Sequence, residues 1–538
     1  MNIDADVVVV GSGVAGAITA CRLAEKGVKN IVILEAGPRI DRAETVIKFR
    51  QSAFLDSSDG YPSPDWAPRP EWAKYNASGG APYIEQAGPA KLLQSEYLRV
   101  VGGTTWHWGG VTPRFLPVDF RMRTAYGVGL DWPLNYDEME PFYTEAEQEI
   151  GIAGQPDAID AYRSKSYPLP PVPLSYCDRV IRDGLLGDGI ELTPRPCARA
   201  TRPYAGRGQC MGFGTCSPIC PSGAHYSAIY HVEKAEKLGV RVRENTRVDR
   251  LVAQGRITTI EARKPDGSLI RVRGKIIVLA ANAMETPRLL LMSAGEHHPA
   301  GIANRSGQVG RNYMEHPSIN GRLRMPKPVY AGRGPSTISG STRGRDGAFR
   351  AERPGWILSV ENKIRFHEIT GELLASGAEP PALDAAIKDR AEREIELDIG
   401  MEQLPDPTNG ISLDWSRRDR AGQPTIRHYY SFTDYEQAGF SHAREMLARI
   451  AKTLGADLLW TSDPATQHHI IGMTRMGEDP KTSVTDSFGR SHDHRNLFIA
   501  SSSLFPTGGT ANPTLTIAAL ALRMAGEIVR QLGAGEHG

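Results

Sequence analysis

The chain has 538 residues, of which 40% are hydrophobic and 23% are charged, as in an ordinary globular protein. Its 63 Lys and Arg residues balance 62 Asp and Glu residues, and the net charge of +1 excludes the basic surface typical of nucleic-acid binding or polybasic membrane attachment. No apolar run approaches the length of a bilayer span, and a chain this long predicts two domains.

The N-terminal residues predict a dinucleotide-binding unit. Residues 6–10 (DVVVV) form a β-branched run typical of a strand buried on both faces of a parallel sheet. They lead into a glycine turn at residues 11–16 (GSGVAG), an apolar helix, and a second strand at residues 31–34 that ends on Glu35. Because the first residues lack a cationic region, we expect a strand here and no export signal on this chain.

The glycines of this turn have separate expected roles. Gly11 makes the tight turn, Gly13 lets the backbone approach a pyrophosphate, and Gly16 lets helix and strand pack closely. The helix N-terminus would face the phosphates, and Glu35 would accept a hydrogen bond from a ribose hydroxyl. A carboxylate here disfavours NADP. The motif alone leaves FAD and NAD open, and a structural glycine turn is the alternative.

Aromatic and glycine-rich segments follow. Residues from about 40 to 95 mix Pro, Trp, Tyr and Ser without a sustained period, which predicts a long ordered loop or lid. In residues 100–110 (VVGGTTWHWGG), two glycine pairs flank the WHW triplet, and this pattern predicts backbone pressed against a flat group. Residues 274–282 predict another buried strand, and residues 285–293 predict a helix.

Half of the six cysteines lie in residues 210–221 (CMGFGTCSPICP), as Cys210, Cys216 and Cys220. Their C-x5-C-x3-C-P spacing favours a cuboidal iron–sulfur site over structural zinc, because zinc wants four ligands and no further pair at zinc spacing lies nearby. Three ligands predict a [3Fe–4S] cluster, with Cys197 as a less favoured fourth ligand. The alternative is three inert buried thiols.

The composition changes again toward the C-terminus. From about residue 325 to 490 the chain has Gly-, Arg- and Ser-rich connectors and a charged helical segment around residues 380–394, which predicts a second domain. It ends with a short apolar strand at residues 496–500, the segment GGTANPTLT at residues 508–516, and a helix from about Ile517.

Several motifs together resemble the glucose–methanol–choline (GMC) family of FAD oxidoreductases. They are GSGVAG with LEAG, VGGTTWHW, LAANAMETPRLLLMS, VGRNYMEHP, HHIIGMTRMG and GGTANPTLTIAALALR, in the family's order over nearly the whole chain. The resemblance implies FAD as the cofactor and an α/β fold, with a Rossmann-type FAD-binding domain and a substrate domain built on an antiparallel sheet. One departure is Ser501-Ser502, where members commonly carry Asp-Gly, so we assign no pyrophosphate contact there.

The resemblance also implies a discontinuous division of the chain. We expect the FAD-binding domain, with the iron–sulfur loop at residues 210–221, to comprise residues 1–45, 95–135, 180–325 and 490–538. We expect a lid and substrate-binding domain over residues 46–94, 136–179 and 326–489. The expected FAD contacts are Gly11, Gly13, Gly16, Glu35, Ala36, Gly102, Gly103, Thr104, His107, Trp108, Val248, Asn512, Pro513 and Thr514.

The expected catalytic pair is His469 and Asn512. A flavin oxidises an alcohol when a base takes the hydroxyl proton and the flavin accepts the hydride. In an extended segment adjacent side chains point to opposite faces, so only one of His468 and His469 can face the flavin, and the family's His-x-x-Gly pattern selects His469. Asn512 would hold the substrate hydroxyl, while Pro513 fixes the local φ and Thr514 opens a helix facing the flavin. The alternatives are a hydrogen-bonded core histidine and a helix-capping asparagine.

His107 raises a separate question. Some family members join a histidine from the equivalent segment to the flavin 8α-methyl group. The resemblance therefore predicts for His107 either this covalent bond or a stacking or hydrogen-bonding role, and it leaves the two open.

Within the family, the cysteine cluster and the WHW segment most resemble catalytic subunits of bacterial cytochrome-linked sugar dehydrogenases, glucose dehydrogenase first, with fructose and gluconate dehydrogenases close behind. This implies oxidation of a sugar hydroxyl, with glucose C1 to gluconolactone favoured, and electrons leaving through the iron–sulfur cluster to a multihaem cytochrome c subunit. It also implies a small chaperone subunit with a twin-arginine signal and a periplasmic, membrane-associated location through these partners. Other polyol or glycoside substrates, an oxygen-using oxidase, and a non-catalytic flavin carrier are the alternatives.

Overall fold

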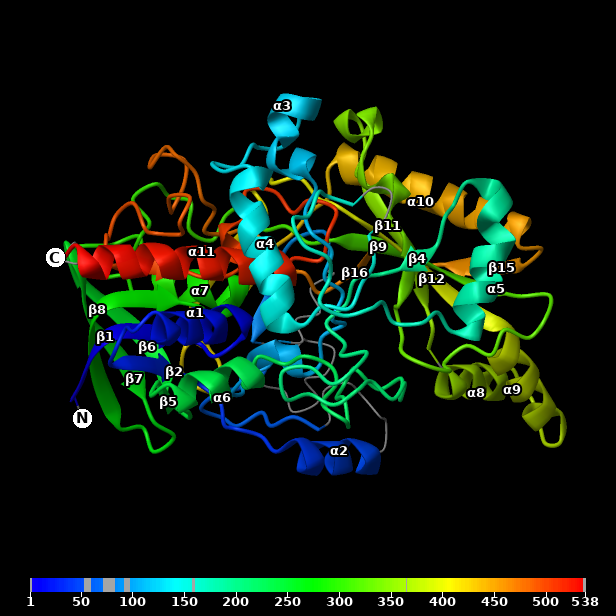
Figure 1. Ribbon diagram of the computed structural model, residues 1–538, viewed down its shortest axis with the longest axis horizontal. Coiled ribbons are helices and arrows are strands. Elements are labelled where there is room, and N and C mark those ends of the chain that lie inside the picture. The colour runs from blue at the N-terminus through cyan, green and yellow to red at the C-terminus, as the bar shows by residue number, and fades with distance from the viewer. Residues whose placement is uncertain are drawn as a thin grey trace.

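The computed structural model describes residues 2–52, 60–70, 83–90, 97–156, 160–363 and 365–535. Two large sheets lie at opposite ends of an elongated molecule, the first beside both chain termini and the second beside helix α10 (Asp434–Thr453) (Figure 1). One sheet is mostly parallel and the other is antiparallel. The expected α/β architecture with a Rossmann-type sheet and an antiparallel substrate-domain sheet is confirmed.

The first sheet is built around the N-terminal strand. Its strands, in spatial order, are β5 (Arg241–Arg243), β2 (Ile31–Leu34), β1 (Asn2–Val10), β8 (Leu269–Leu279), β7 (Arg256–Arg263) and β6 (Arg247–Gln254), with β17 (Leu497–Ile499) paired on β8. Strands β5, β2, β1, β8 and β17 are parallel, whereas β6 and β7 form an antiparallel hairpin on β8. Val7, Val8 and Val9 are fully buried, because both faces of the parallel part are covered.

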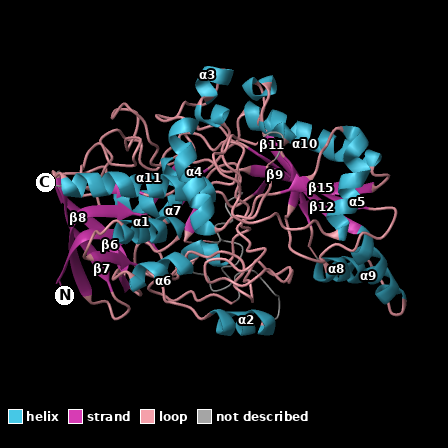
Figure 2. Cartoon of the chain, viewed as in Figure 1, coloured by secondary structure: helices cyan, strands magenta, loops and turns pink. Residues whose placement is uncertain are grey.

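Helices cover this sheet. α1 (Val14–Glu25) packs between α11 (Thr514–Gly533) and α6 (Ile229–Lys237), and α4 (Tyr136–Ile150) lies across α11 (Figure 2). The chain's first helix therefore contacts one that lies close to its C-terminus, so residues near both ends of the chain meet over the parallel sheet.

The second sheet has an apolar face and a polar face. Its strands, in spatial order, are β15 (Asp457–Thr461), β9 (Pro317–Arg324), β12 (Glu394–Met401), β11 (Trp356–Glu361), β10 (Ser339–Ser341) and β4 (Thr193–Pro194), with β16 (Ala465–Thr466) paired on β9. The apolar residues of β9, β11 and β12 pack with α10 and α5 (Tyr176–Leu185) in one core. The alternate residues therefore face the other way, toward the middle of the molecule.

The remaining elements are smaller. They are α2 (Arg42–Gln51), α3 (Met122–Tyr126), α7 (Asn282–Met292), α8 (Phe366–Ala375), α9 (Ala382–Arg393), the sheet β13–β14–β3 (Gly410–Arg418, Pro424–Tyr429, Ile84–Gln86), and the 3-10 helices η2 (Gly103–Trp106), η3 (Pro117–Phe120), η4 (Leu186–Asp188), η5 (Arg343–Arg345), η6 (Ala348–Ala351) and η7 (Ser502–Leu504). The helices α8 and α9 form a hairpin that projects from the molecule (Figure 1).

Most predicted elements are present, with shifted ends. The helix expected at residues 285–293 is α7 and begins at Asn282, and the one expected from Ile517 is α11 and begins at Thr514. The expected loop or lid at about residues 40–95 contains α2 and β3 instead of continuous loop, while its residues 53–59, 71–82 and 91–96 lie outside the described part of the chain.

The division into two domains stays a prediction, although some elements, strand β4 among them, lie apart from the part to which they were assigned. Strand β9, expected with the FAD-binding domain, belongs to the antiparallel sheet through β12. Helix α4, expected with the substrate domain, packs on α11 in the core of the parallel sheet.

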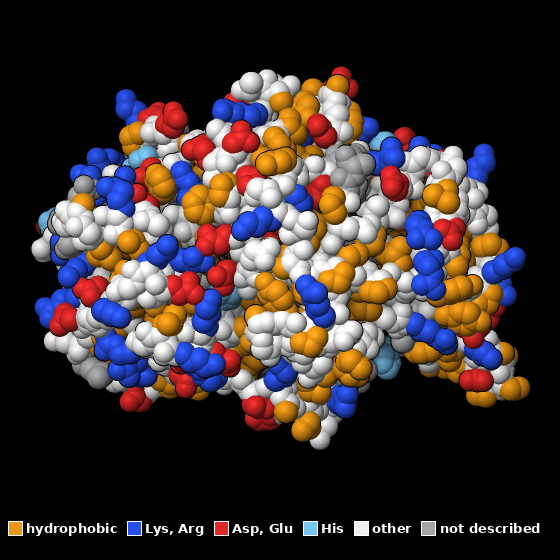
Figure 3. All heavy atoms as spheres, viewed as in Figure 1, with side chains coloured by type: hydrophobic (Ala, Val, Ile, Leu, Met, Phe, Trp, Pro, Cys, Tyr) orange, Lys and Arg blue, Asp and Glu red, His pale blue; other side chains and the backbone are white. Residues whose placement is uncertain are grey.

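Basic and acidic side chains are intermingled over the face shown in Figure 3, as the net charge of +1 leads one to expect. Among the residues that the structure describes, no helix combines the length and the apolar composition that a bilayer span needs.

Candidate active site

Two adjoining cavities form one groove from the parallel sheet toward the antiparallel sheet. The first opens at the carboxyl ends of β1 and β2, and the second, of about 680 Å³, is lined from both sheets. They are continuous because they share Gly13, Tyr97, Thr104, Ala280 and Asn282. A ligand crevice outside the carboxyl ends of parallel strands is the position expected for a dinucleotide.

The predicted cofactor contacts divide between the two cavities. The first is lined by Gly11, Gly13, Glu35, Ala36, Gly103, Thr104 and Val248. The second is lined by Gly13, Thr104, His107, Trp108, Asn512, Pro513 and Thr514, together with His469 and the Ser501-Ser502 pair. Gly16 and Gly102 line neither cavity, so the structure gives these two residues a role in the backbone and places the other predicted contacts along the groove.

The glycine turn leaves an open approach at one position. A Cβ on Gly16 would lie 2.1 Å from the carbonyl oxygen of Gly11, so only glycine allows the helix and the turn to meet here. A Cβ on Gly13, in contrast, would meet no protein atom within 4 Å. Because Gly13 lines both cavities and precedes α1, this open space is where a pyrophosphate would approach the helix N-terminus.

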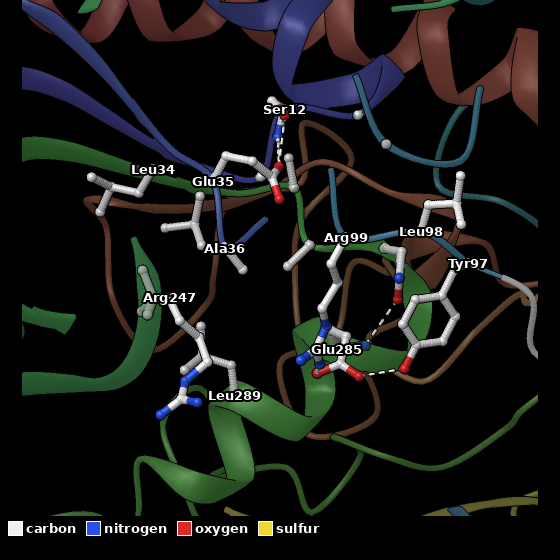
Figure 4. Close-up of a pocket in the computed structure, with 18 of the residues that line it drawn as sticks. Ser12, Leu34, Glu35, Ala36, Tyr97, Leu98, Arg99, Arg247, Glu285 and Leu289 are labelled. Atoms are coloured by element: carbon white, nitrogen blue, oxygen red, sulfur yellow. Dashed lines mark hydrogen bonds and ion pairs between the residues drawn. The ribbon is translucent and has the colours of Figure 1, made fainter. Parts of the chain in front are cut away.

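The buried side chain of Glu35 holds the glycine turn through hydrogen bonds. Its carboxylate accepts hydrogen bonds from the Ser12 backbone N–H (3.0 Å) and the Ser12 hydroxyl (2.6 Å) (Figure 4), and from the Gly37 N–H (3.0 Å). The Ser12 hydroxyl oxygen in turn accepts from the N–H of Gly102, 3.1 Å away, which joins the two glycine-rich segments. Glu35 still lines the first cavity, so it can face a ribose as well.

Arg99 is a cofactor-site residue that the sequence motifs did not indicate. It lines the first cavity, and its Nη2 pairs with Glu285 Oε2 at 2.8 Å (Figure 4). Although burial acts to raise it, Arg99 and Arg288 lower the pKa of Glu285 to about 2. The buried Arg99 Nη1 has no hydrogen-bond partner among the described residues. Arg99 thus has one N–H group that no described residue uses, and it lines the same cavity as Gly13. Such a cationic donor fits the diphosphate of FAD.

The WHW segment forms part of the second cavity's wall. His107 lies beside the Tyr61 ring, with 5.6 Å between ring centroids. Trp108 donates from Nε1 to the carbonyl of Tyr226 at 2.8 Å and stacks on His225, with 5.6 Å between centroids and 5° between planes. These contacts hold both side chains in the wall. Covalent attachment of FAD to His107 stays a prediction.

The structure brings His469 and Asn512 together at the second cavity. Asn512 Nδ2 lies 3.1 Å from His469 Nε2, and Asn512 Oδ1 lies 3.1 Å from Arg195 Nη2. A guanidinium can only donate, so Arg195 fixes the amide oxygen toward itself and the amide nitrogen toward His469. Asn512 does not cap α11, whose N-cap residue is Pro513.

A second contact fixes the tautomer of His469. His316 Nε2 lies 2.8 Å from the carbonyl oxygen of Gly509, which can only accept, so this nitrogen carries the proton. Burial lowers the pKa of His316, and the neutral ring therefore has its lone pair on Nδ1. That atom lies 2.9 Å from His469 Nδ1, which must donate. His469 consequently carries its proton on Nδ1 and an unprotonated Nε2 toward Asn512.

Burial also keeps His469 neutral. Burial lowers its pKa well below the ordinary histidine value, and His316, His468 and Arg195 act in the same direction. Its backbone N–H donates to Glu315 Oε1 at 2.6 Å, which holds the residue in place. A neutral imidazole with its lone pair facing a cavity can act as a general base.

The expectation that His468 and His469 alternate on an extended segment is wrong. The segment is not regularly extended, because His468 has a φ of 61°, in the left-handed region. Both side chains line the second cavity, but His469 bonds to His316 and Asn512, whereas the His468 backbone N–H donates to Thr466 Oγ1. Strand alternation therefore does not distinguish the two rings, and the bonds of His469 to His316 and Asn512 mark it as the candidate base.

The cysteine loop lies near this site. Cys197, Cys210 and Cys220 belong to one small apolar cluster, and the Nε–H of Arg199 donates to Cys216 Sγ at 3.3 Å. Burial raises the pKa of the Cys197 thiol, whereas Arg199 acts to lower it. All four are free cysteines. Within the described ranges, no three His, Cys, Asp or Glu side chains are arranged around one metal position, so the iron–sulfur cluster stays a prediction.

Comparisons with known proteins agree with this arrangement. The family model "GMC oxidoreductase" matches residues 195–318 with its N-terminal part and 405–521 with its C-terminal part, and "FAD binding domain" matches residues 6–59. The chain is 38% identical to the fructose dehydrogenase large subunit of Gluconobacter japonicus, over 99% of each chain. It is 25% identical to the gluconate 2-dehydrogenase flavoprotein of Pantoea cypripedii, over 96% of this chain and 92% of that protein.

A solved structure shows the same fold. Pyridoxine 4-oxidase from "Mesorbium loti" superposes with a TM-score of 0.63 at 21% identity, over 97% of this chain and 99% of that one. At this identity the likeness extends to the fold alone.

Proposed function

Because this chain belongs to the GMC oxidoreductase family and is an FAD-dependent enzyme acting on CH–OH groups, we propose that it is a sugar or polyol dehydrogenase with His469 as its catalytic base. The observation that carries this proposal is the hydrogen-bond chain from Arg195 through Asn512 and His469 to His316, which leaves one basic nitrogen at the cavity. FAD, when bound, supplies a two-electron acceptor for the hydride of the alcohol carbon.

The protein's own residues handle the proton. A substrate hydroxyl takes the place of the Asn512 amide beside His469 Nε2, donates its proton to that nitrogen, and accepts a hydrogen bond from the amide. The developing alkoxide is stabilised by this amide, whose orientation Arg195 fixes. Thr514 begins a helix of 20 residues at the cavity, and its N-terminus favours negative charge there.

The substrate is proposed to be a ketose such as fructose, or a polyol. The sequence motifs favour glucose, but the relative with 38% identity over 99% of its length is a fructose dehydrogenase subunit. Gluconate is the second candidate, because the relative with 25% identity is a gluconate 2-dehydrogenase flavoprotein.

Electrons are proposed to leave through the cysteine loop. Residues 195–199 span the two sites, because Arg195 contacts Asn512 and Arg199 contacts Cys216. Ser217, the neighbour of Cys216, lines the second cavity together with Asn512, so the cysteine loop reaches the cavity of the catalytic pair. Cys210, Cys216 and Cys220 would hold a [3Fe–4S] cluster, which would pass single electrons onward, and the buried Arg199 would offset its negative charge.

Partner subunits are part of this proposal. The fructose dehydrogenase relative is a large subunit, which implies further subunits in that enzyme. We propose a small subunit with a twin-arginine signal, a multihaem cytochrome c subunit as electron acceptor, and a periplasmic location at the membrane through these partners.

The test is a dye-linked assay of the purified, FAD-loaded enzyme with ketoses, aldoses, polyols and aldonic acids. The proposal expects dye reduction with at least one sugar or polyol and little peroxide. The solved structure with this fold is an oxidase, so peroxide formed in air as fast as the dye is reduced would instead support an oxygen-using enzyme.

A further inference from the structure

We infer that Asp398 selects the substrate: its carboxylate receives a hydroxyl group of an uncharged, polyhydroxylated substrate and repels aldonate anions. This inference rests on the proposed sugar or polyol dehydrogenase activity and narrows its substrate class. Three features of the protein support it: the polar face of the antiparallel sheet, the link of Asp398 to the catalytic pair, and the charges of the cavity.

The antiparallel sheet turns a row of polar side chains toward the second cavity. Leu397 and Ile399 of β12 point into the apolar core on α10, so Asp398 between them points the other way. The strand register places Asp398 opposite Asn320 of β9 and Ser359 of β11, and all three line the cavity. Such a row offers hydrogen bonds to several hydroxyl groups of one substrate.

This row is tied to both catalytic side chains. Arg195 donates from Nη1 to the Ser359 hydroxyl at 2.6 Å and from Nη2 to Asn512 at 3.1 Å. On the other side, Gln467 donates to Asp398 through its side-chain amide, two residues before His469. Asp398 therefore lines the same cavity as His469 and Asn512 and is linked to both through neighbouring residues.

The charges of the cavity favour a neutral substrate. Its described charged residues are Glu315, Glu361, Glu396 and Asp398 against Arg195 and Lys363. Lys363 pairs with Glu361 at 2.7 Å, and Glu396 pairs with Arg365. Arg195 already bonds to Ser359 and Asn512. The remaining cation among the described lining residues, Arg195, also acts on Asp398 and favours its charged form, so a substrate carboxylate would compete with Asp398 for this one cation.

Asp398 accepts hydrogen bonds from Gln467 and Ser318 and, with four acceptor positions on its two oxygens, can accept a further one from a substrate hydroxyl. It has no ion-pair contact with a described Lys or Arg, and burial, with the nearby Glu361, raises its pKa to about 7. A hydrogen bond from a hydroxyl group stabilises a buried carboxyl group that has no ion pair, and a sugar or polyol supplies such a donor. An aldonate supplies hydroxyl groups as well, but it brings a second negative charge into the same cavity.

The test compares fructose and gluconate with the FAD-loaded wild-type enzyme, Asp398→Asn and a control, Glu394→Gln. Glu394 lies on the same strand but pairs with Arg390 and does not line the cavity. We expect Asp398→Asn to raise the KM for fructose about tenfold or more with a smaller change in kcat. In Asp398→Asn, the kcat/KM for fructose divided by the kcat/KM for gluconate should fall by the same factor. In Glu394→Gln this ratio should equal that of the wild type.

A measurement on the wild-type enzyme keeps the inference testable if Asp398→Asn loses FAD. Gluconate added to fructose assays should not inhibit at concentrations where fructose saturates the enzyme. Competitive inhibition with a constant near the KM for fructose, a preference for gluconate, or an unchanged ratio in a folded Asp398→Asn enzyme would overturn the inference. Failure of every sugar and polyol to reduce the wild-type flavin would instead overturn the proposed function.

Discussion

His316 Nδ1 lies 2.9 Å from His469 Nδ1, and this contact decides which nitrogen of His469 is basic. The carbonyl of Gly509 fixes the proton of His316 on Nε2, and Arg195 fixes the amide of Asn512 from the opposite end. Both ends of the hydrogen-bond chain therefore require an unprotonated His469 Nε2 at the cavity.

Replacing His316 should slow flavin reduction without removing FAD. In His316→Leu, His469 loses the acceptor of its Nδ1 proton, and its ring can adopt the wrong tautomer. We expect the rate of flavin reduction by substrate to fall between about 10-fold and 100-fold, the range typical for removing such an outer partner of a histidine. His316→Gln keeps a donor and an acceptor and should recover part of the rate. A yellow His316→Leu enzyme with the wild-type rate would contradict the assigned tautomer.

The pH dependence should report the lowered pKa of His469. The base works only when unprotonated, and burial lowers its pKa well below 6.5, so protonation requires a more acidic solution. The rate constant of flavin reduction should therefore hold down to pH 6.5 and fall only below it. Stopped-flow mixing without an external acceptor measures this step alone. A half-maximal rate at or above pH 6.5 would show that His469 is not held neutral by its surroundings.

Gly13→Val should give a folded protein without FAD. The new side chain would project into the open space beside both cavities, where its Cβ meets no protein atom within 4 Å, and Gly13 has a φ of −66°, so the backbone is not strained. Absorbance of the purified protein measures bound flavin, and its circular dichroism measures folding. The control, Gly16→Val, should damage folding itself, because its Cβ would overlap the Gly11 carbonyl. A yellow Gly13→Val protein would place the pyrophosphate elsewhere.

The sequence predicts the parallel sheet better than the rest of the fold. Residues 6–10 and the glycine turn are a local pattern, and local patterns are readable from one sequence. Helix α2 has no such pattern, because only Thr45 of its residues is buried. Its one local signal is Asp41, whose side chain accepts from the Glu44 N–H and caps the helix.

The sequence pointed to the residues of the candidate site but not to the hydrogen bonds that join them. His469 and Asn512 lie in recognisable motifs, whereas the contact of His316 with His469 joins residues 153 positions apart. Arg195 reaches Asn512 across 317 positions and belongs to no motif that we recognised. Such pairings depend on how the two sheets meet, and no spacing in the sequence encodes them.

Cys216→Ser should separate substrate oxidation from electron export. If the three cysteines hold a cluster, the variant loses iron and the broad absorbance that overlies the flavin bands. Substrate should still reduce the flavin, because hydride transfer uses His469 and needs no iron, while transfer to a cytochrome or an electrode collapses. Iron analysis and the two half-reactions on the purified variant measure this. Normal electron transfer to the cytochrome would show that the cysteines are structural.

The central claim is that His469 takes the proton of a substrate hydroxyl, and anaerobic stopped-flow mixing of the FAD-loaded enzyme with fructose or a polyol tests it most directly. The account predicts that the wild-type flavin bleaches and that His469→Ala retains FAD but bleaches about 100-fold or more slowly, the typical contribution of a positioned base. His468→Ala, the neighbouring control, should bleach at nearly the wild-type rate. A His469→Ala enzyme that bleaches as fast as the wild type, or a reversed order of the two variants, would contradict the account.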